Sequence, residues 1–249
     1  MKTNFTIIPL IFFLIRAFTS LNHYTDISSV LISFFIGFLL LLLSFHMTIK
    51  EKKGLKILSS ILLLFFFGVL LTTMTNFIQI HYFHTNNDFL IILALVFLSL
   101  LIGKNNIDTI VSMSSLLFIV FLLTFFLFVV GIIHELSFIS ISIQPSISML
   151  SFGFLFITKY FQEKKIQVYK GYLLAFIITL LEVSLGYFSL GYLLSITYLF
   201  TNVSIFKYIP QLSFLGNFEV ILSFVYLFQY TITLGLLIHL FKRKTIKEK

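Results

Sequence analysis

An uncharged run from Thr109 to Ile133 constrains the fold of this chain more than any other stretch. Its 25 residues lie between Asp108 on one side and His134 and Glu135 on the other. A helix rises about 1.5 Å per residue, so a helix of this length exceeds the roughly 30 Å hydrocarbon core of a bilayer. Hydrocarbon offers no hydrogen-bond partner to an exposed backbone, so the segments that meet lipid must all be helical. The run therefore predicts a helical membrane protein.

The composition extends this prediction to the whole chain. The 249 residues are 59% hydrophobic and 10% charged, and the mean hydropathy is +1.09. This leaves no room for an extramembrane domain between the apolar runs. We expect an all-α fold, a single transmembrane domain over residues 1–249 with eight spans in the bilayer. The expected spans are 4–21, 28–48, 56–80, 88–103, 108–134, 136–159 (broken), 171–200 and 218–241.

The positions of lysine and arginine predict the orientation. Translocation leaves these residues on the cytoplasmic side of short loops. With a cytoplasmic N-terminus, fifteen of the seventeen fall in cytoplasmic segments, whereas Lys207 lies outside and Arg16 lies within the first span. Both termini are therefore expected in the cytoplasm, and we treat the first span as retained and not as a cleaved signal peptide. The net charge of +8 reports orientation and does not indicate nucleic-acid binding.

Two of the expected spans are irregular. The span 136–159 is interrupted by Gln144, Pro145 and Ser146 and again by Gly153. Such interruptions are typical of the discontinuous helices that surround transporter binding sites. The apolar run that starts at Gly171 is too long for one perpendicular helix, so we expect a tilted or two-part segment there.

Two charged residues fall inside expected spans. Glu182 is about 11 residues into its span, roughly 16 Å from the cytoplasmic edge, where ionisation is costly. It is either a proton or substrate-amine site or a protonated carboxyl group hydrogen-bonded between helices. Arg16 lies in the outer half of the first span, and we favour snorkelling to the interface over its alternative, an ion pair with Glu182.

Polar side chains form two stripes at helical spacing. The stripe on the third span consists of Thr72, Thr75, Asn76 and Gln79, and the stripe on the last span consists of Ser223, Tyr226, Tyr230 and Thr233. In lipid such stripes face other helices or a wet cavity. Hydrogen bonding between helices explains either stripe alone, but two stripes beside a broken helix favour a cavity. We expect Thr72, Thr75, Asn76, Gln79, Ser151, Gly153, Tyr226 and Tyr230 to bind a small-molecule solute.

Signals for other chemistry are weak. His23, His81, His84 and His134 lie on the expected outer side, but on separate loops without the spacing of a metal motif, so we read them as solvated residues and expect no metal or other cofactor. The chain has no cysteine. No phosphate-binding glycine loop or nucleophile motif is present, so we expect no enzymatic activity.

Four short motifs resemble one known family. Asp26 to Leu31 resembles a D-A-W-x-S-V-L motif at the start of the second span of that family, and Asn106 to Phe118 resembles the G-I-E-x-I-x-R-x-x-E-I-x-F-P motif of the fifth. Ser151 to Phe154 stands where its broken sixth helix has G-[FY]-E, and Phe214 to Glu219 resembles F-[IL]-E-R-x-E. The family is the spore germination receptor B subunit (GerAB-type), within the amino acid–polyamine–organocation transporter superfamily.

The chain also departs from the motifs of that family. Ser112 and Ser115 stand where the family has Arg and Glu, Leu155 stands where it has Glu, and Asn217 stands where it has Arg. Eight spans are two fewer than the five-plus-five inverted repeat of the superfamily. The resemblance therefore implies a truncated LeuT-like (5+3) architecture.

The resemblance implies a function as well. It implies a nutrient-sensing subunit of the spore inner membrane that binds a small amino acid-like solute or a sugar. It also implies two partners, an A-type membrane subunit and a C-type lipoprotein. The alternatives are a proton-coupled amino acid transporter that uses Glu182, and a purely structural membrane assembly subunit.

Overall fold

The computed structural model describes residues 6–21, 27–46, 53–81, 88–132, 148–190 and 216–246, and all regular structure within them is helical. The first five elements are the α-helices α1 (Ile8–Thr19), α2 (Ile27–His46), α3 (Lys53–His81), α4 (Asp88–Lys104) and α5 (Ile107–Ile132). A short 3-10 helix, η2 (Met149–Gly153), then leads into α6 (Phe154–Thr158), and a second, η3 (Lys159–Lys164), leads into α7 (Lys165–Leu190). The last described helix is α10 (Gly216–Ile246).

Five helical segments of the described chain are long and apolar enough to cross a membrane. These segments are Ile27–His46, Leu58–Gln79, Ile107–Ile132, Met149–Phe188 and Ser223–Arg243. The prediction of a helical, multi-pass membrane protein is therefore confirmed at this level. The eight spans and the LeuT-like repeat are not confirmed, because α1 and α4 are shorter and α6 and α7 fall within one segment.

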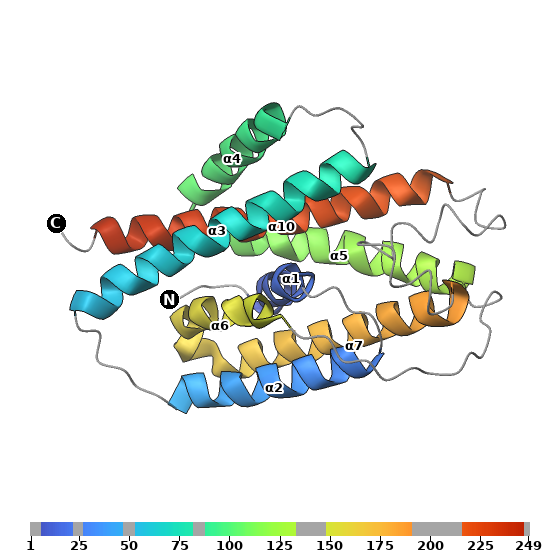
Figure 1. Cartoon of the computed structure of the whole chain (residues 1–249), viewed down its shortest axis with the longest axis horizontal. Helices are drawn as coiled ribbons and strands as arrows, with labels where there is room; N and C mark the ends of the chain where they lie inside the picture. The colour runs from blue at the N-terminus through green and yellow to red at the C-terminus, as the bar shows by residue number, and fades with distance from the viewer. Residues whose placement is uncertain are drawn as a thin grey trace.

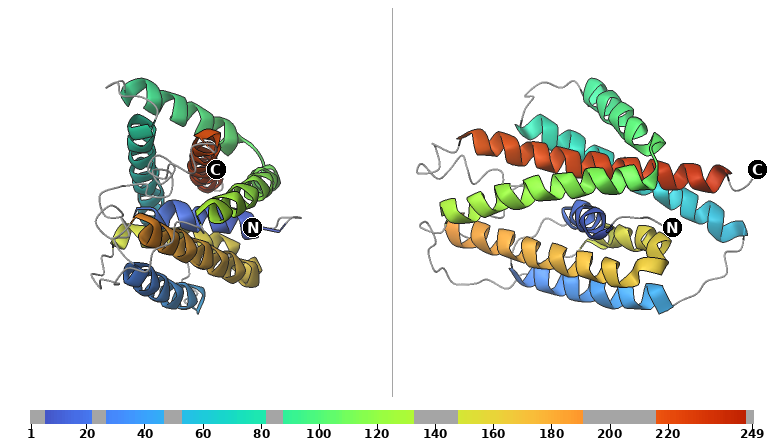
Figure 2. Two further views of the ribbon diagram at one scale, coloured as in Figure 1. Left: turned by 90° about the vertical axis from the view of Figure 1, so that its right-hand side faces the viewer. Right: turned by 180° about the vertical axis from the view of Figure 1, so that it is seen from behind.

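The helices are arranged in layers around α1 (Figures 1 and 2). On one side of α1 lie α3, α5 and α10, with α4 packed outside them against α10 and α3. On the other side lie α6 and α7, with α2 packed against α7. In Figure 1 α1 is seen nearly end-on while most of the others run across the view, so it crosses the bundle at a steep angle.

Helix α1 is the centre of the core and is shorter than the membrane span predicted for residues 4–21. Its 12 residues extend about 18 Å, which is well short of the hydrocarbon thickness. Every residue from Pro9 to Thr19 is buried, and the helix contacts α5, α7, α10 and the η2–α6 segment. Pro9 in the first turn is compatible with a helix start, because the backbone N–H that proline lacks would have no partner within the helix at this position.

The close packing of α1 on α7 depends on Gly171. A Cβ atom at this position would lie 2.8 Å from Ile11 Cγ2 and 3.1 Å from the carbonyl oxygen of Ile8. Small residues allow helix backbones to approach closely in membrane proteins. Close to this contact, the backbone N–H of Ile7 donates to Gln167 Oε1 at 2.9 Å. This hydrogen bond holds the N-terminal end of α1 against α7.

The predicted break in the span 136–159 is partly visible. Gln144 and Pro145 lie outside the described residues, but Ser148 has an extended backbone (φ −97°, ψ 128°), so helical structure begins within the predicted span. Gly153 itself is helical and marks the change from η2 to α6. Phe161 then has a non-helical backbone (φ −107°, ψ 28°), and α7 begins six residues earlier than predicted, at Lys165.

Basic residues gather at one end of the bundle. Here α2, α4 and α10 end and α3, α5 and α7 begin (Figure 1). We call this the basic end, and it is defined by Lys104, Lys159, Lys164, Lys165, Lys170, Lys242 and Arg243. The described acidic residues near it are Asp108 and Glu163. Such one-sided charge is the distribution that the lysine count in the sequence predicts.

Candidate functional site

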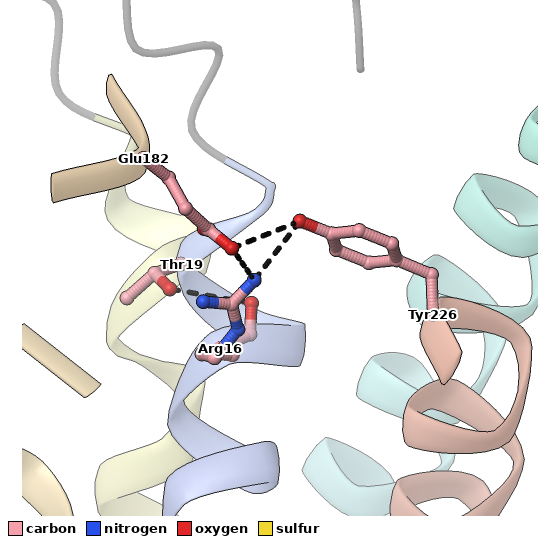
Figure 3. A network of polar contacts seen from close by, with 4 residues as sticks. All are labelled: Arg16, Thr19, Glu182 and Tyr226. Carbon is pink, nitrogen blue, oxygen red and sulfur yellow. Dashed lines mark hydrogen bonds and ion pairs between the residues drawn. The ribbon is translucent and has the colours of Figure 1, made fainter. Parts of the chain in front are cut away.

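Three helices bring polar side chains together beside the C-terminal half of α1. Arg16 of α1 donates from Nη2 to Glu182 Oε1 of α7 at 2.8 Å and to the hydroxyl of Tyr226 of α10 at 2.9 Å. The Tyr226 hydroxyl also donates to Glu182 Oε1 at 3.4 Å, which closes a triangle (Figure 3). We call these three residues the Arg16 centre.

The Arg16 centre is buried. Arg16 and Glu182 are each 4% exposed, and Tyr226 is 7% exposed. The favoured interpretation of Arg16, snorkelling to the interface, is therefore wrong, and the alternative ion pair with Glu182 is what the structure contains. An arginine in the middle of the core cannot reach water, so a carboxylate partner is the arrangement that reduces the cost of its burial.

Aromatic rings surround the Arg16 guanidinium. Its Cζ lies 4.8 Å from the ring centroid of Phe121, 5.4 Å from that of Phe12 and 5.6 Å from that of Tyr226. The negative faces of such rings attract a cation, most strongly where water is excluded. The charge of Arg16 is thus stabilised by one carboxylate and by aromatic rings from α1, α5 and α10.

Several buried polar atoms of α1 and α10 lack hydrogen-bond partners among the described residues. Arg16 Nε and Nη1 have no hydrogen-bond partner among the described residues, and neither amide atom of Gln229 has one. Gln229 is 1% exposed and lies three residues after Tyr226 on α10. An unsatisfied buried polar group costs about 1–3 kcal/mol. The Arg16 centre therefore has N–H groups available for an acceptor that the described residues do not supply.

A second polar contact joins α1 to α10. The hydroxyl groups of Ser20 and Tyr230 are hydrogen-bonded to each other, and Ser20 Oγ donates to the carbonyl oxygen of Ala17 at 2.8 Å. Thr19 Oγ1 donates to the Arg16 carbonyl oxygen at 3.2 Å (Figure 3). The last turn of α1 is thereby held against the same face of α10 that carries Tyr226.

The two predicted stripes have different surroundings. On α10, Ser223, Tyr226, Tyr230 and Thr233 are all buried. On α3, only Thr75 is buried, whereas Thr72 and Asn76 are exposed and Gln79 is half-buried and hydrogen-bonded to Asp88 of α4. Phe77 is the α3 residue that faces Tyr226, with ring centroids 6.2 Å apart. The α3 stripe is therefore not gathered at the Arg16 centre.

Ser151 and Gly153 lie in the core beside α1. Ser151 Oγ donates to the carbonyl oxygen of Ser148 at 2.6 Å, so its hydroxyl is used within η2. A Cβ at Gly153 would lie 2.5 Å from ring atoms of both Phe18 and Phe66. These two predicted site residues pack the half-length helix against α1 and α3.

Sequence reasoning missed Ser20, Gln229 and the rings of Phe12 and Phe121. Ser20 lies one helical turn after Arg16, and Gln229 lies three residues after Tyr226, so both were recognisable as polar residues at helical spacing from predicted ones. Phe12 and Phe121 could not be recognised as site residues, because the chain has 34 phenylalanines and nothing distinguishes these two in the sequence.

In comparisons with known proteins, no family model, no curated protein and no solved structure matches the chain. The function must therefore be argued from the geometry of the Arg16 centre.

Proposed function

We propose that the protein is a multi-pass membrane receptor subunit that binds a small, amino acid-like solute at the Arg16 centre. The observation that carries the proposal is the buried Arg16 guanidinium, whose Nε and Nη1 have no acceptor among the described residues. A carboxylate is the acceptor that a guanidinium binds most strongly. The solute would place its carboxylate on these atoms and its amine toward Glu182.

The position of α1 supports this proposal. Helix α1 is packed between the two halves of the bundle and carries both Arg16 and Ser20, which contact α7 and α10. A ligand that competes for the bonds of Arg16 would change how these helices are joined. Ligand binding could thus be transmitted to a partner subunit without transport.

The partners and membrane follow from the resemblance and are part of the same proposal. The subunit would work with an A-type membrane subunit and a C-type lipoprotein in the inner membrane of a spore. The basic end would face the cytoplasm, since translocation retains Lys and Arg there. Both termini would then also be cytoplasmic.

A proton-coupled amino acid transporter is the second candidate, and the burial of Glu182 favours it. A buried carboxylate near an intramembrane arginine is an arrangement that proton relays use. A purely structural assembly subunit is the third, because the same ion pair joins α1 to α7.

Solute binding by the purified chain in nanodiscs separates these candidates. Arg16→Lys keeps a positive charge opposite Glu182 but removes the Nε and Nη1 donors, so a receptor should stay folded and lose binding to the amino acid that the wild type selects from a panel. Ser112→Ala, on the exposed side of α5, is the matched control. Proton-driven amino acid uptake by the wild-type chain in liposomes would establish the transporter instead, and absence of binding to every amino acid would refute the proposal.

A further inference from the structure

A cavity of about 240 Å³ lies between α3, α4 and α10, away from the Arg16 centre. Its eight lining side chains are all apolar: Leu63, Leu64, Phe67, Val96, Leu100, Leu237, Ile238 and Phe241. Leu63 and Leu237 are buried and form its floor, whereas Leu64 is 55% exposed and Leu100 is 43% exposed. The cavity therefore opens between α3 and α4 on the outer surface of the bundle.

The chemistry of the cavity selects its occupant. Water needs two to four polar partners, and an apolar cavity of about 150 Å³ stays dry and accepts a hydrocarbon. This cavity is larger and offers only side-chain carbon, and its walls belong to helices of which two are candidate membrane spans. An aliphatic chain from the surrounding lipid is the ligand that these walls fit.

Two lysines follow the cavity lining by one helical turn. Val96, Leu100 and Lys104 are spaced i, i+4 and i+8 along α4, and Ile238 and Lys242 are spaced i and i+4 along α10. Residues at this spacing lie on one face of a helix. The side chains of Lys104 and Lys242 are both exposed, and both belong to the basic end. A positive charge is thus placed about one turn from the cavity on each of two walls.

These two features fit one molecule, because an anionic phospholipid carries an acyl chain and a phosphate at a fixed short distance. We propose that the cavity between α3, α4 and α10 is a specific binding site for an anionic phospholipid, with an acyl chain against Leu100 and Phe241 and its phosphate at Lys104 and Lys242. Basic residues at one end of transmembrane helices are the feature that recognises such headgroups.

Native mass spectrometry of the full chain, released from nanodiscs of mixed phosphatidylglycerol and phosphatidylcholine, tests the site. We expect one phosphatidylglycerol to be retained in preference to phosphatidylcholine. Lys104→Gln and Lys242→Gln should each lower this preference by about fivefold, and Lys170→Gln, an exposed lysine of α7 at the same end, should leave it unchanged.

A second pair of variants separates the acyl-chain site from general charge attraction. Leu100→Trp fills the cavity without changing a charge, and its partly exposed position tolerates the larger ring, so retention should be lost. Leu116→Trp, at a 69% exposed position of α5 away from the cavity, should retain the lipid. Equal retention of the two lipids, unchanged retention in Leu100→Trp, or a second copy of the chain in place of lipid would overturn the proposal.

Discussion

Arg16 Nη2 and Glu182 Oε1 are 2.8 Å apart although 166 residues separate them in the chain, and both side chains are buried. The two residues lie on α1 and α7, which also meet at Gly171 and at the hydrogen bond from Ile7 N–H to Gln167 Oε1. In a medium of low dielectric constant, burying both charges carries a desolvation cost. Removing one partner costs more, because the other charge then stays buried without a partner.

Neutralising one member of the pair should therefore destabilise the protein strongly. We expect Arg16→Gln and Glu182→Gln each to cost about 3–5 kcal/mol, measured as denaturation in detergent micelles. The double variant should cost less than the sum of the two, since it leaves no uncompensated charge. Additive effects would show that the two side chains do not interact.

Replacing Tyr226 by Phe keeps the ring beside Arg16 and removes the hydroxyl group. One Nη2 hydrogen would lose its acceptor, so we expect a loss of about 1–3 kcal/mol in unfolding free energy. The same replacement in the Arg16→Gln background should have a smaller effect. An equal effect in both backgrounds would contradict the hydrogen bond between Arg16 and Tyr226.

The crossing of α4 and α10 should not tolerate side chains at its glycines. A Cβ at Gly235 would clash with Ile102 Cγ2, and one at Gly103 would lie 3.0 Å from the carbonyl oxygen of Gly235. We expect Gly235→Val to cost about 1–3 kcal/mol through overpacking. Gly68→Val is the control, because nothing lies within 4 Å of its Cβ position. If Gly235→Val and Gly68→Val were equally stable, α4 and α10 would not cross at these glycines.

The orientation can be tested by labelling, since the native chain has no cysteine. We expect Lys104→Cys to react with an impermeant maleimide only from the cytoplasmic side and Phe89→Cys only from the outer side. These residues are near opposite ends of α4. Labelling of both from one side would show that α4 does not cross the bilayer.

The sequence predicted the long helices well, because an uncharged run in lipid has few alternatives to a helix. Predicted spans 28–48 and 108–134 correspond to α2 at Ile27–His46 and α5 at Ile107–Ile132. It did not predict that α1 is short and central. Hydropathy measures the cost of contact with water, so it cannot distinguish a helix that faces lipid from one enclosed by other helices.

The stripe on α3 shows why polar spacing alone did not locate the site. Thr72 Oγ1 donates to the carbonyl oxygen of Gly68 at 3.0 Å, and Thr75 Oγ1 donates to that of Leu71 at 2.9 Å. A threonine that is bonded to its own helix needs no polar neighbour and can face either direction. A charged side chain has no such option, so the ion pair between Arg16 and Glu182, which the sequence analysis held only as the alternative, is what marks the centre.

Arginine-selective nitrogen NMR of the purified protein in nanodiscs tests the central claim most directly. Arg16 and Arg243 are the two arginines of the chain, so Arg243→Lys assigns both signals. We predict that Arg16 Nε–H exchanges slowly with solvent, and that its resonance shifts when the bound amino acid is added while that of Arg243 does not. An Arg16 signal that exchanges as fast as that of Arg243 and does not respond to any amino acid would contradict a buried, solute-binding guanidinium.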